Sequence, residues 1–336
     1  LDLMFDLSDV PEKDLPMVGL LQAVLGIIDT EHYEYGELFN EINRHTGGIG
    51  TSLELYPDVT KVKEKEFKAT FEIKGKALYG QIPFAIRMMK EILTASKLDD
   101  EKRLKEILSM TKTRLQDRFL SAGHSAAALR AMSYKSPISK FKDTTNGIEY
   151  YQNIREMEEH FDEKKEEIIS GLKALSELLF RKGNVMISYT ASREGLAVLE
   201  EEIGSLKEAL YPERTPESRC ILHCEKKNEG FKTSSKVQFA AKAGNFIDAG
   251  EEYNGALQIL KVIMSYEYLW INIRVKGGAY GCMSNFNRIG EGYFVSYRDP
   301  NLGRTLEIYD GVPEYLENFT VSERDMTKYI IGTISN

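Results

Sequence analysis

The sequence is poor in cysteine, has no long apolar run and carries no excess of basic residues. Its three cysteines, Cys220, Cys224 and Cys282, are too few for a disulfide framework, which favours a reducing compartment, the cytoplasm or an organellar matrix. No apolar run of about 18 residues is present, so no membrane span is expected, and no signal peptide is visible. The net charge of −8 argues against a surface that binds nucleic acid.

What the sequence does contain is typical of a globular protein with two domains. Of its 336 residues, 42% are hydrophobic and 29% are charged. The chain starts at Leu1 rather than at a methionine, and it stops at Asn336 within an expected helix. We therefore expect it to be a fragment of a longer protein.

Apolar periodicity predicts strands and helices in alternation over the first 210 residues. The glycine pair Gly47-Gly48 is expected to end a helix, and residues 134–147 carry turn signals that predict a loop. The expected strands are 3–8, 49–56, 66–74 and 185–189, and the expected helices are 14–28, 35–44, 84–93, 100–120 with a continuation to 132, 148–180 and 194–210.

Residues 211–230 are predicted to connect two domains, residues 1–210, which include a helical insertion, and residues 231–336. Pro212 and Pro216 punctuate the start of this connector, and few periodic signals follow. The second domain is expected to hold strands 236–241, 282–286 and 293–297 and helices 251–273, 302–319, with a kink at Pro313, and 322–331.

The two parts resemble each other around a Gly-Gly turn. Residues 44–48 (Arg-His-Thr-Gly-Gly) and residues 274–278 (Arg-Val-Lys-Gly-Gly) share the arginine and the glycine pair, and each is followed by two expected strands and a helix. This repeat predicts an α+β protein of two similar domains, each a mostly antiparallel sheet with helices packed on one face. After the turn the first copy has Ile49-Gly50 and the second has Ala279-Tyr280, so only the second copy has a phenol.

The Gly-Gly turn of the second copy carries the candidate site. Glycine accepts the left-handed backbone that ends helices, so Arg274 is expected on a last helical turn and Tyr280 at the entry to the next strand. A fixed cation and a phenolic hydroxyl on one rim can both donate a hydrogen bond to a carbonyl oxygen. The pattern also fits a plain helix end, where the helix dipole favours a basic residue. A phosphate loop is disfavoured, because Gly277-Gly278 ends a helix and no Lys-Ser/Thr follows.

Three other polar clusters are weaker candidates. Cys220, His223 and Cys224 fit a soft metal clip only in part, because no fourth ligand is evident. His124 lies in Gly-His-Ser, which lacks the Gly-x-Ser-x-Gly elbow of a nucleophile and favours a small-residue helix junction. The pair Arg298-Asp299 ends a strand, and a structural role, in which these side chains pair with each other or with a neighbour, is expected there.

Two motifs and three shorter stretches link the chain to a family. The motifs are Arg-Val-Lys-Gly-Gly-Ala-Tyr-Gly at 274–281 and Ser-Tyr-Arg-Asp-Pro-Asn-Leu at 296–302, and the stretches are 3–8, 46–50 and 331–335. Together they resemble the C-terminal half of presequence-protease-type zinc peptidases, the large single-chain members of the insulinase-like (pitrilysin) family M16. The resemblance covers nearly the whole chain and implies the LuxS-like fold of M16 metallopeptidases.

The resemblance implies a function as well. The chain is expected to be the non-zinc-binding half of a zinc metalloendopeptidase that degrades short unstructured peptides in an enclosed chamber. Arg274 and Tyr280 match the pair that, in this family, holds the substrate backbone beside the zinc ion, which implies a catalytic and substrate-binding role for both. Gly277 and Gly278 are expected to contribute to substrate binding at the same turn.

The zinc motif of the family is missing. Complete members carry His-x-x-Glu-His on a helix of the N-terminal half, whereas none of the five histidines here lies at that spacing from another. We therefore expect this chain alone to bind no zinc and to be inactive, with the N-terminal catalytic half and an unfolded peptide as partners, and no nucleic acid or membrane. Two other interpretations stay open: a separate non-catalytic peptide-binding subunit, and a scaffold protein of the same superfamily.

Overall fold

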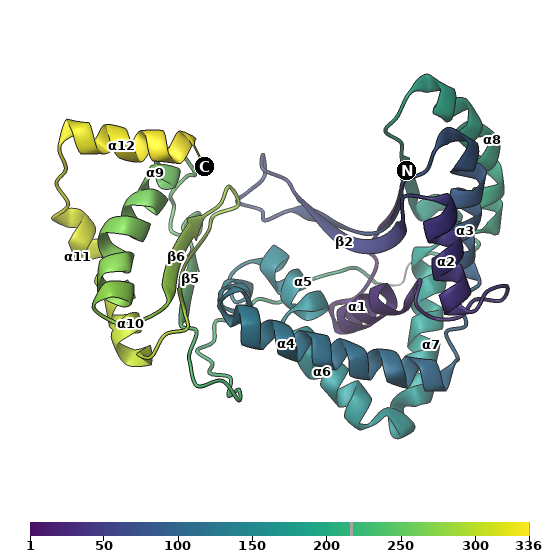
Figure 1. The fold of residues 1–336 in the computed structure, drawn as a ribbon, viewed down its shortest axis with the longest axis horizontal. Coiled ribbons are helices and arrows are strands. Elements are labelled where there is room, and N and C mark those ends of the chain that lie inside the picture. Colours follow the sequence, from purple (N-terminus) through teal and green to yellow (C-terminus); the bar gives the residue numbers. More distant parts are fainter. Residues whose placement is uncertain (216–217, 336) are drawn as a thin grey trace. The chain divides into compact units, whose positions relative to one another are not determined.

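A computed structural model describes residues 1–215 and 218–335, which divide by their contacts into two units (Figure 1). Unit 1 holds Leu1–Tyr56, Phe67–Arg114 and Thr144–Ile221; unit 2 holds Pro57–Glu66, Leu115–Asp143 and the described chain from Leu222 onward. Each unit thus combines segments that lie far apart in the sequence. The predicted boundaries along the chain, 1–210, 211–230 and 231–336, stay a prediction, and Pro216 of the connector lies outside the described residues.

Unit 1 is built on a four-stranded sheet with the order β2-β3-β1-β4. Its strands are β1 (Asp2–Asp6), β2 (Ile49–Pro57), β3 (Phe67–Gly75) and β4 (Val185–Ser188). β1 runs antiparallel to both β3 and β4. Phe5 of β1 and Phe71 of β3 are register partners, fully buried, and both contact Phe180 edge-on, with ring centroids 5.0 and 5.4 Å away. These rings form the centre of the core that the sheet shares with its helices.

The helices of unit 1 follow the predicted periodicity with two differences, the first of which is that the expected helix 14–28 ends at Val24. The expected helix 148–180 is two helices, because the backbone at His160 leaves the helical region with φ −112° and ψ 29°. The helices of unit 1 are α1 (Leu15–Val24), α2 (Tyr35–His45), α3 (Ile82–Thr94), α6 (Ile148–Glu159), α7 (Phe161–Leu179) and α8 (Arg193–Ala209), with short 3-10 turns at η1 (Glu12–Asp14), η2 (Tyr79–Gln81) and η3 (Lys182–Asn184).

Residues 134–147 are not the predicted loop. They hold helix α5 (Pro137–Asn146), which follows the long helix α4 (Glu101–Ser133). Pro137 occupies the first helical position, where a missing N–H is tolerated, and the Ser139 amide donates to the Ser136 hydroxyl at 3.4 Å. Phe141 buries its ring on the inner side of α5. The Ser-Pro pair is therefore a helix start, and the burial of Phe141 gives the helix a face to pack.

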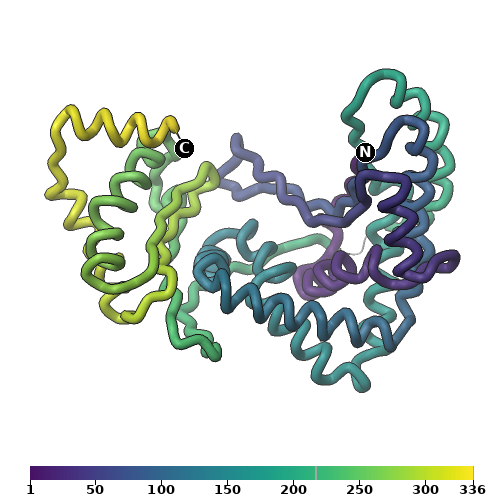
Figure 2. Tube along the Cα trace, in the orientation of Figure 1, coloured from purple at the N-terminus to yellow at the C-terminus, as the bar shows by residue number. Residues whose placement is uncertain are grey.

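Unit 2 contains a three-stranded antiparallel sheet in the order β5-β7-β6. Figure 1 labels β5 and β6, and Figure 2 traces the same green part of the chain. Its strands are β5 (Ala241–Asn245), β6 (Gly281–Phe286) and β7 (Glu291–Tyr297). The prediction of the first strand at 236–241 was wrong, because Gln238 forms only an isolated bridge to Asp299, and regular pairing begins at Ala241 opposite Val295. Phe239, within the expected strand, contacts the ring of Tyr297.

The helices of unit 2 differ from prediction in geometry more than in position. The expected helix 251–273 starts at Ala256 and changes to π geometry at Met264, and the expected helix 302–319 breaks at Gly311, next to Pro313. Its helices are α9 (Ala256–Ile263), η4, a π-helix (Met264–Val275), α10 (Leu302–Asp310), α11 (Val312–Glu317) and α12 (Glu323–Ile334). Three of these helices, η4, α10 and α11, contribute Met264, Leu269, Ile273, Tyr309 and Val312 to a buried cluster that also holds Cys282 of β6.

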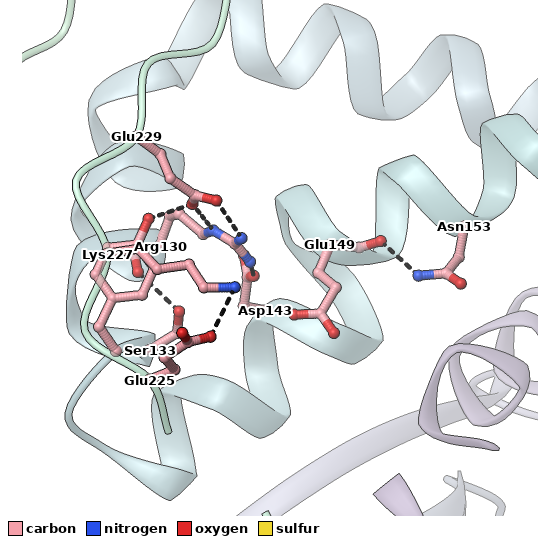
Figure 3. Close-up of polar contacts among 9 residues, drawn as sticks. Arg130, Ser133, Asp143, Glu149, Asn153, Glu225, Lys227 and Glu229 are labelled. Atoms are coloured by element: carbon pink, nitrogen blue, oxygen red, sulfur yellow. Dashed lines mark hydrogen bonds and ion pairs between the residues drawn. The ribbon is translucent and has the colours of Figure 1, made fainter. Parts of the chain in front are cut away.

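A charged network holds the irregular segment before β5 in unit 2 (Figure 3). Arg130 of α4 is paired with Asp143 of α5 at 2.6 Å and with Glu229 of this segment at 2.8 Å. The Tyr134 hydroxyl also donates to Glu229, and the Arg130 guanidinium carbon lies 5.8 Å from the ring centre of Phe231. Asp143 is fully buried. Arg130 therefore neutralises an interior carboxylate and also holds the irregular segment through Glu229.

The fold class is confirmed: the chain is α+β, with antiparallel sheets and packed helices. After each Gly-Gly turn the chain forms two strands that are neighbours in a sheet, β2 and β3 after the first turn and β6 and β7 after the second, and then a helix. In the described part of the chain, no helix is long and apolar enough to cross a bilayer.

Candidate functional site

Arg274 and Tyr280 lie on either side of a tight turn at the end of η4. Arg274 is in the last turn of the helix, and Tyr280 directly precedes β6. The turn closes with the Gly278 amide on the carbonyl of Arg274 at 2.9 Å, and the Ala279 amide on that of Ile273 at 3.1 Å. Gly278 has φ +79°, the left-handed conformation that glycine adopts without strain. The backbone thus brings the two side chains to one rim.

Gly277 is required by the closeness of the helix end. A Cβ atom at this position would lie 2.4 Å from the carbonyl oxygen of Ile273, which is backbone and cannot move aside. We expect Gly277→Ala to lower the free energy of unfolding by roughly 1–3 kcal/mol, as other strained substitutions do. Urea denaturation with Gly303→Ala as the control measures this, because a Cβ at Gly303 in α10 meets open space. Equal stability of Gly277→Ala and wild type would contradict the strain argument.

The Arg274 guanidinium is held by aromatic and backbone contacts. Its central carbon lies 4.1 Å from the ring centre of Trp270 and 5.5 Å from that of Tyr280. One terminal nitrogen donates to the carbonyl oxygen of Tyr280 at 2.6 Å. Within the described residues no carboxylate forms an ion pair with Arg274. It is therefore a permanent cation with donors left over, since a guanidinium has five N–H groups.

Tyr280 combines a fixed backbone with an exposed ring. Its amide donates to the carbonyl oxygens of Tyr297 at 3.0 Å and Arg298 at 3.3 Å, which pins the residue to the end of β7. The side chain is 64% exposed and contacts the Tyr297 ring edge-on at 5.8 Å between centroids. Its hydroxyl has no hydrogen-bond partner in the part of the chain that the structure describes. The phenol is therefore a positioned and unused donor.

The residues after β7, 298–301, are hydrogen-bonded to the Gly277-Gly278 turn. Asp299 is fully buried and accepts hydrogen bonds from the Asn301 amide at 2.8 Å and the Thr305 hydroxyl at 2.6 Å. The Asn301 side chain then donates to the carbonyl oxygen of Gly277 at 2.5 Å. Asp299 therefore pairs with neighbouring residues, which is one of the two structural roles expected for it. Arg298 does not pair with it, but lies 5.4 Å from the Tyr297 ring centre with φ +49°.

Tyr280 is part of a row of aromatic side chains within unit 2, most of which no sequence pattern predicted. The Tyr297 ring contacts His124 of α4 at 4.8 Å and Phe239 at 5.8 Å between centroids. Burial lowers the pKa of His124 below 6.5, and its Nδ1 atom is buried without a hydrogen-bond partner among the described residues. His124 is therefore a packing residue next to the break in α4 at Ala122, in line with the predicted helix junction.

The residues present do not fit a metal ion. Nowhere in residues 1–215 and 218–335 do three His, Cys, Asp or Glu side chains gather as ligands would. Cys220, Cys224 and Cys282 form no disulfide among the described residues. Burial raises the pKa of both Cys220 and Cys282 to about 11, so neither thiol ionises readily at neutral pH.

These thiols should differ in reactivity, because the thiolate is the nucleophile. Cys224 is exposed and Cys282 is buried. With an aromatic disulfide reagent at pH 8 we expect Cys224 to react first and Cys282 last, with all three reacting at once after denaturation. The Cys224→Ser variant should lack the fast phase. A Cys282 that reacts as fast as Cys224 would contradict the packing of β6.

Two family models match the chain over most of its length. Residues 1–157 match the associated domain of peptidase family M16, subfamily C, and residues 228–336 match the PreP C-terminal domain. Among solved structures, a peptidase M16 inactive domain from Pseudomonas fluorescens covers 98% of this chain, with a TM-score of 0.56, 16% identity and 77% of that chain covered. A conserved protein from Enterococcus faecalis gives a TM-score of 0.58 at 13% identity, over 98% of this chain and 77% of that one.

Curated relatives match the chain over nearly its whole length. Protein HypA of Clostridium perfringens is 39% identical over 98% of this chain and 34% of its own length. Presequence protease 1, chloroplastic/mitochondrial, of Arabidopsis thaliana is 29% identical over 100% of this chain and 31% of its own length. The chain thus spans about a third of these relatives.

The fold is that of the inactive domains of M16 peptidases. Within this family the chain belongs to subfamily C, and it corresponds to the C-terminal part of presequence-protease-type proteins. The predicted resemblance is confirmed.

Proposed function

We propose that this chain is the non-zinc-binding half of a metalloendopeptidase that degrades short unstructured peptides in an enclosed chamber, and that Arg274 and Tyr280 form its substrate clamp. The observation that carries the proposal is the geometry of the turn after η4. It presents on unit 2 a cation with no ion pair and a phenolic hydroxyl with no hydrogen-bond partner among the described residues. A plain helix end needs the cation but gives no reason for the phenol.

The chemistry that these two side chains supply is electrostatic. Hydrolysis of a peptide bond passes through a tetrahedral intermediate, whose oxygen carries negative charge. The Tyr280 hydroxyl donates a hydrogen bond to this oxygen, and Arg274 holds a neighbouring carbonyl of the peptide with its remaining N–H groups. Gly277 and Gly278 contribute by having no side chain, which lets the peptide approach the turn.

Zinc belongs to the other half in this proposal. The described residues of this chain offer no ligand cluster, so a zinc ion and the residues that activate water come from the N-terminal catalytic half. That half and an unfolded peptide are the proposed partners. Two relatives carry "chloroplastic/mitochondrial" and "mitochondrial" in their names. Three cysteines that form no disulfide among the described residues suit a reducing compartment such as an organellar matrix or the cytoplasm.

A reconstitution experiment tests the proposal. A fluorescent unstructured peptide is incubated with this chain alone, with the zinc-binding N-terminal half of a presequence-protease-type peptidase alone, and with both. We expect cleavage only with both, and loss of cleavage on adding a chelator. Cleavage at the same rate without this chain would overturn the proposal and favour a scaffold role, whereas chelator-sensitive cleavage by this chain alone would show that it holds its own metal.

A further inference from the structure

We propose that Trp270 is a positioning residue for Arg274, and that its indole face sets the direction in which the guanidinium presents its donors. Trp270 is the only tryptophan of the chain, and it lies one turn before Arg274 on η4. The catalytic consequence of this inference rests on the proposed clamp, whereas the contact itself does not.

The contact joins residues four apart on η4, a spacing that brings side chains together on one helix face. In a π-helix the backbone bonds join residues five apart, as the Lys276 amide does with the carbonyl oxygen of Ile271 at 3.0 Å. The guanidinium carbon of Arg274 lies 4.1 Å from the centre of the Trp270 ring. That distance is well inside the range of about 6 Å for a cation–π interaction, for which tryptophan is the best partner.

An indole holds an arginine differently from a carboxylate. A carboxylate would take up two N–H groups in a bidentate pair, but an aromatic face attracts the cation through its π electrons and leaves the N–H groups in the guanidinium plane free. Among the described residues only the Tyr280 carbonyl accepts a hydrogen bond from Arg274. The arrangement thus fixes the orientation of the cation and keeps most of its donors available for substrate carbonyls.

Trp270 is not needed to fill the core of unit 2. Its side chain is 37% exposed, whereas the neighbours on the inner face of η4, Leu269 and Ile273, are buried to 0% and 1% exposure. Truncation of Trp270 should therefore remove the ring that contacts Arg274 and leave the core intact. Ile271, equally exposed at 37% on the same helix, supplies a matched control.

The first test is spectroscopic and needs no ligand, because all tryptophan emission of this chain comes from Trp270. Loss of the adjacent charge in Arg274→Gln should shift the emission maximum relative to wild type. Lys276→Gln removes the charge of a residue two positions further on. Lys276 has no cation–π contact among the described residues, so this change should leave the emission unchanged. Equal spectra for wild type and Arg274→Gln would overturn the proposed contact.

The second test uses the complete enzyme with a fluorescent peptide. We expect Trp270→Leu to raise KM about threefold to tenfold with kcat unchanged, because a cation–π contact of this strength supports ground-state binding. Trp270→Phe should recover most of the loss, and Ile271→Ala should leave KM unchanged. If Trp270 had a purely structural role, its substitution would lower the melting temperature and kcat and would not raise KM alone. That result would overturn the proposal. A spectral shift with no effect of Arg274→Gln on KM would refute the clamp and leave the indole contact standing.

Discussion

Tyr280→Phe should lower kcat about a hundredfold in the complete enzyme, the usual loss when one donor to an oxyanion is removed. The substitution deletes one oxygen atom from a side chain that is 64% exposed, and that oxygen has no partner among the described residues. The ring contact with Tyr297 and both backbone hydrogen bonds remain. Stability should therefore stay unchanged, and the loss should lie in the rate of the chemical step.

Steady-state kinetics with a fluorescent peptide separates this effect from binding. If the hydroxyl acts only in the transition state, kcat and kcat/KM fall equally, whereas Arg274→Gln should mainly raise KM. Tyr266→Phe provides a control, since Tyr266 is 63% exposed on the same π-helix. Unchanged kcat for Tyr280→Phe would rule out the proposed role of the phenol and leave the scaffold interpretation.

The turn at the centre of the site was predictable because its determinants are local. Gly277 and Gly278 impose the helix end by backbone sterics alone, and this end sets the positions of Arg274 and Tyr280. The family resemblance then singled out these two residues from many arginines and tyrosines. Local backbone chemistry and a family motif agree here, so the positions of the two residues followed from the sequence.

The surroundings of the turn were less predictable because they depend on distant residues. A helix over 251–273 followed from apolar spacing, but its later start at Ala256 and its change to π geometry at Met264 did not. Likewise His124 is far in sequence from Tyr297, and neither residue carries a signal for their contact. Helix α5 was missed for a different reason, because a Ser-Pro pair marks a turn and a helix start equally well.

Arg130→Ala should be among the most destabilising single substitutions in unit 2, lowering the free energy of unfolding by about 3–5 kcal/mol. Arg130 is 12% exposed, and its partner Asp143 is fully buried. Removal of the guanidinium takes away a charge partner at 2.6 Å from a carboxylate that water does not reach. It also releases Glu229 (Figure 3) and the ring of Phe231, so the segment before β5 loses these contacts with α4.

Glu229→Gln removes the charge pair between Arg130 and Glu229 and leaves the pair between Arg130 and Asp143 in place. Hydrogen bonds from Arg130 lower the pKa of Glu229 below its ordinary value of 4.5. The stabilisation from this pair is therefore present above pH 4.5 and is lost as the pH falls through the lower pKa of the folded state. We expect Glu229→Gln to cost about 1–2 kcal/mol at pH 7 and to flatten the acid limb of the stability profile.

Urea denaturation between pH 3 and pH 8 measures both effects, with Arg304→Ala as the control. Arg304 is exposed on α10 and has no ion pair among the described residues, so its loss should change stability by less than about 0.5 kcal/mol. A cost for Arg130→Ala as small as that of Arg304→Ala would show that Asp143 does not depend on Arg130. If instead the predicted order holds, the segment that leads into β5, and with it the sheet beside Tyr280, is held in place by one buried cation.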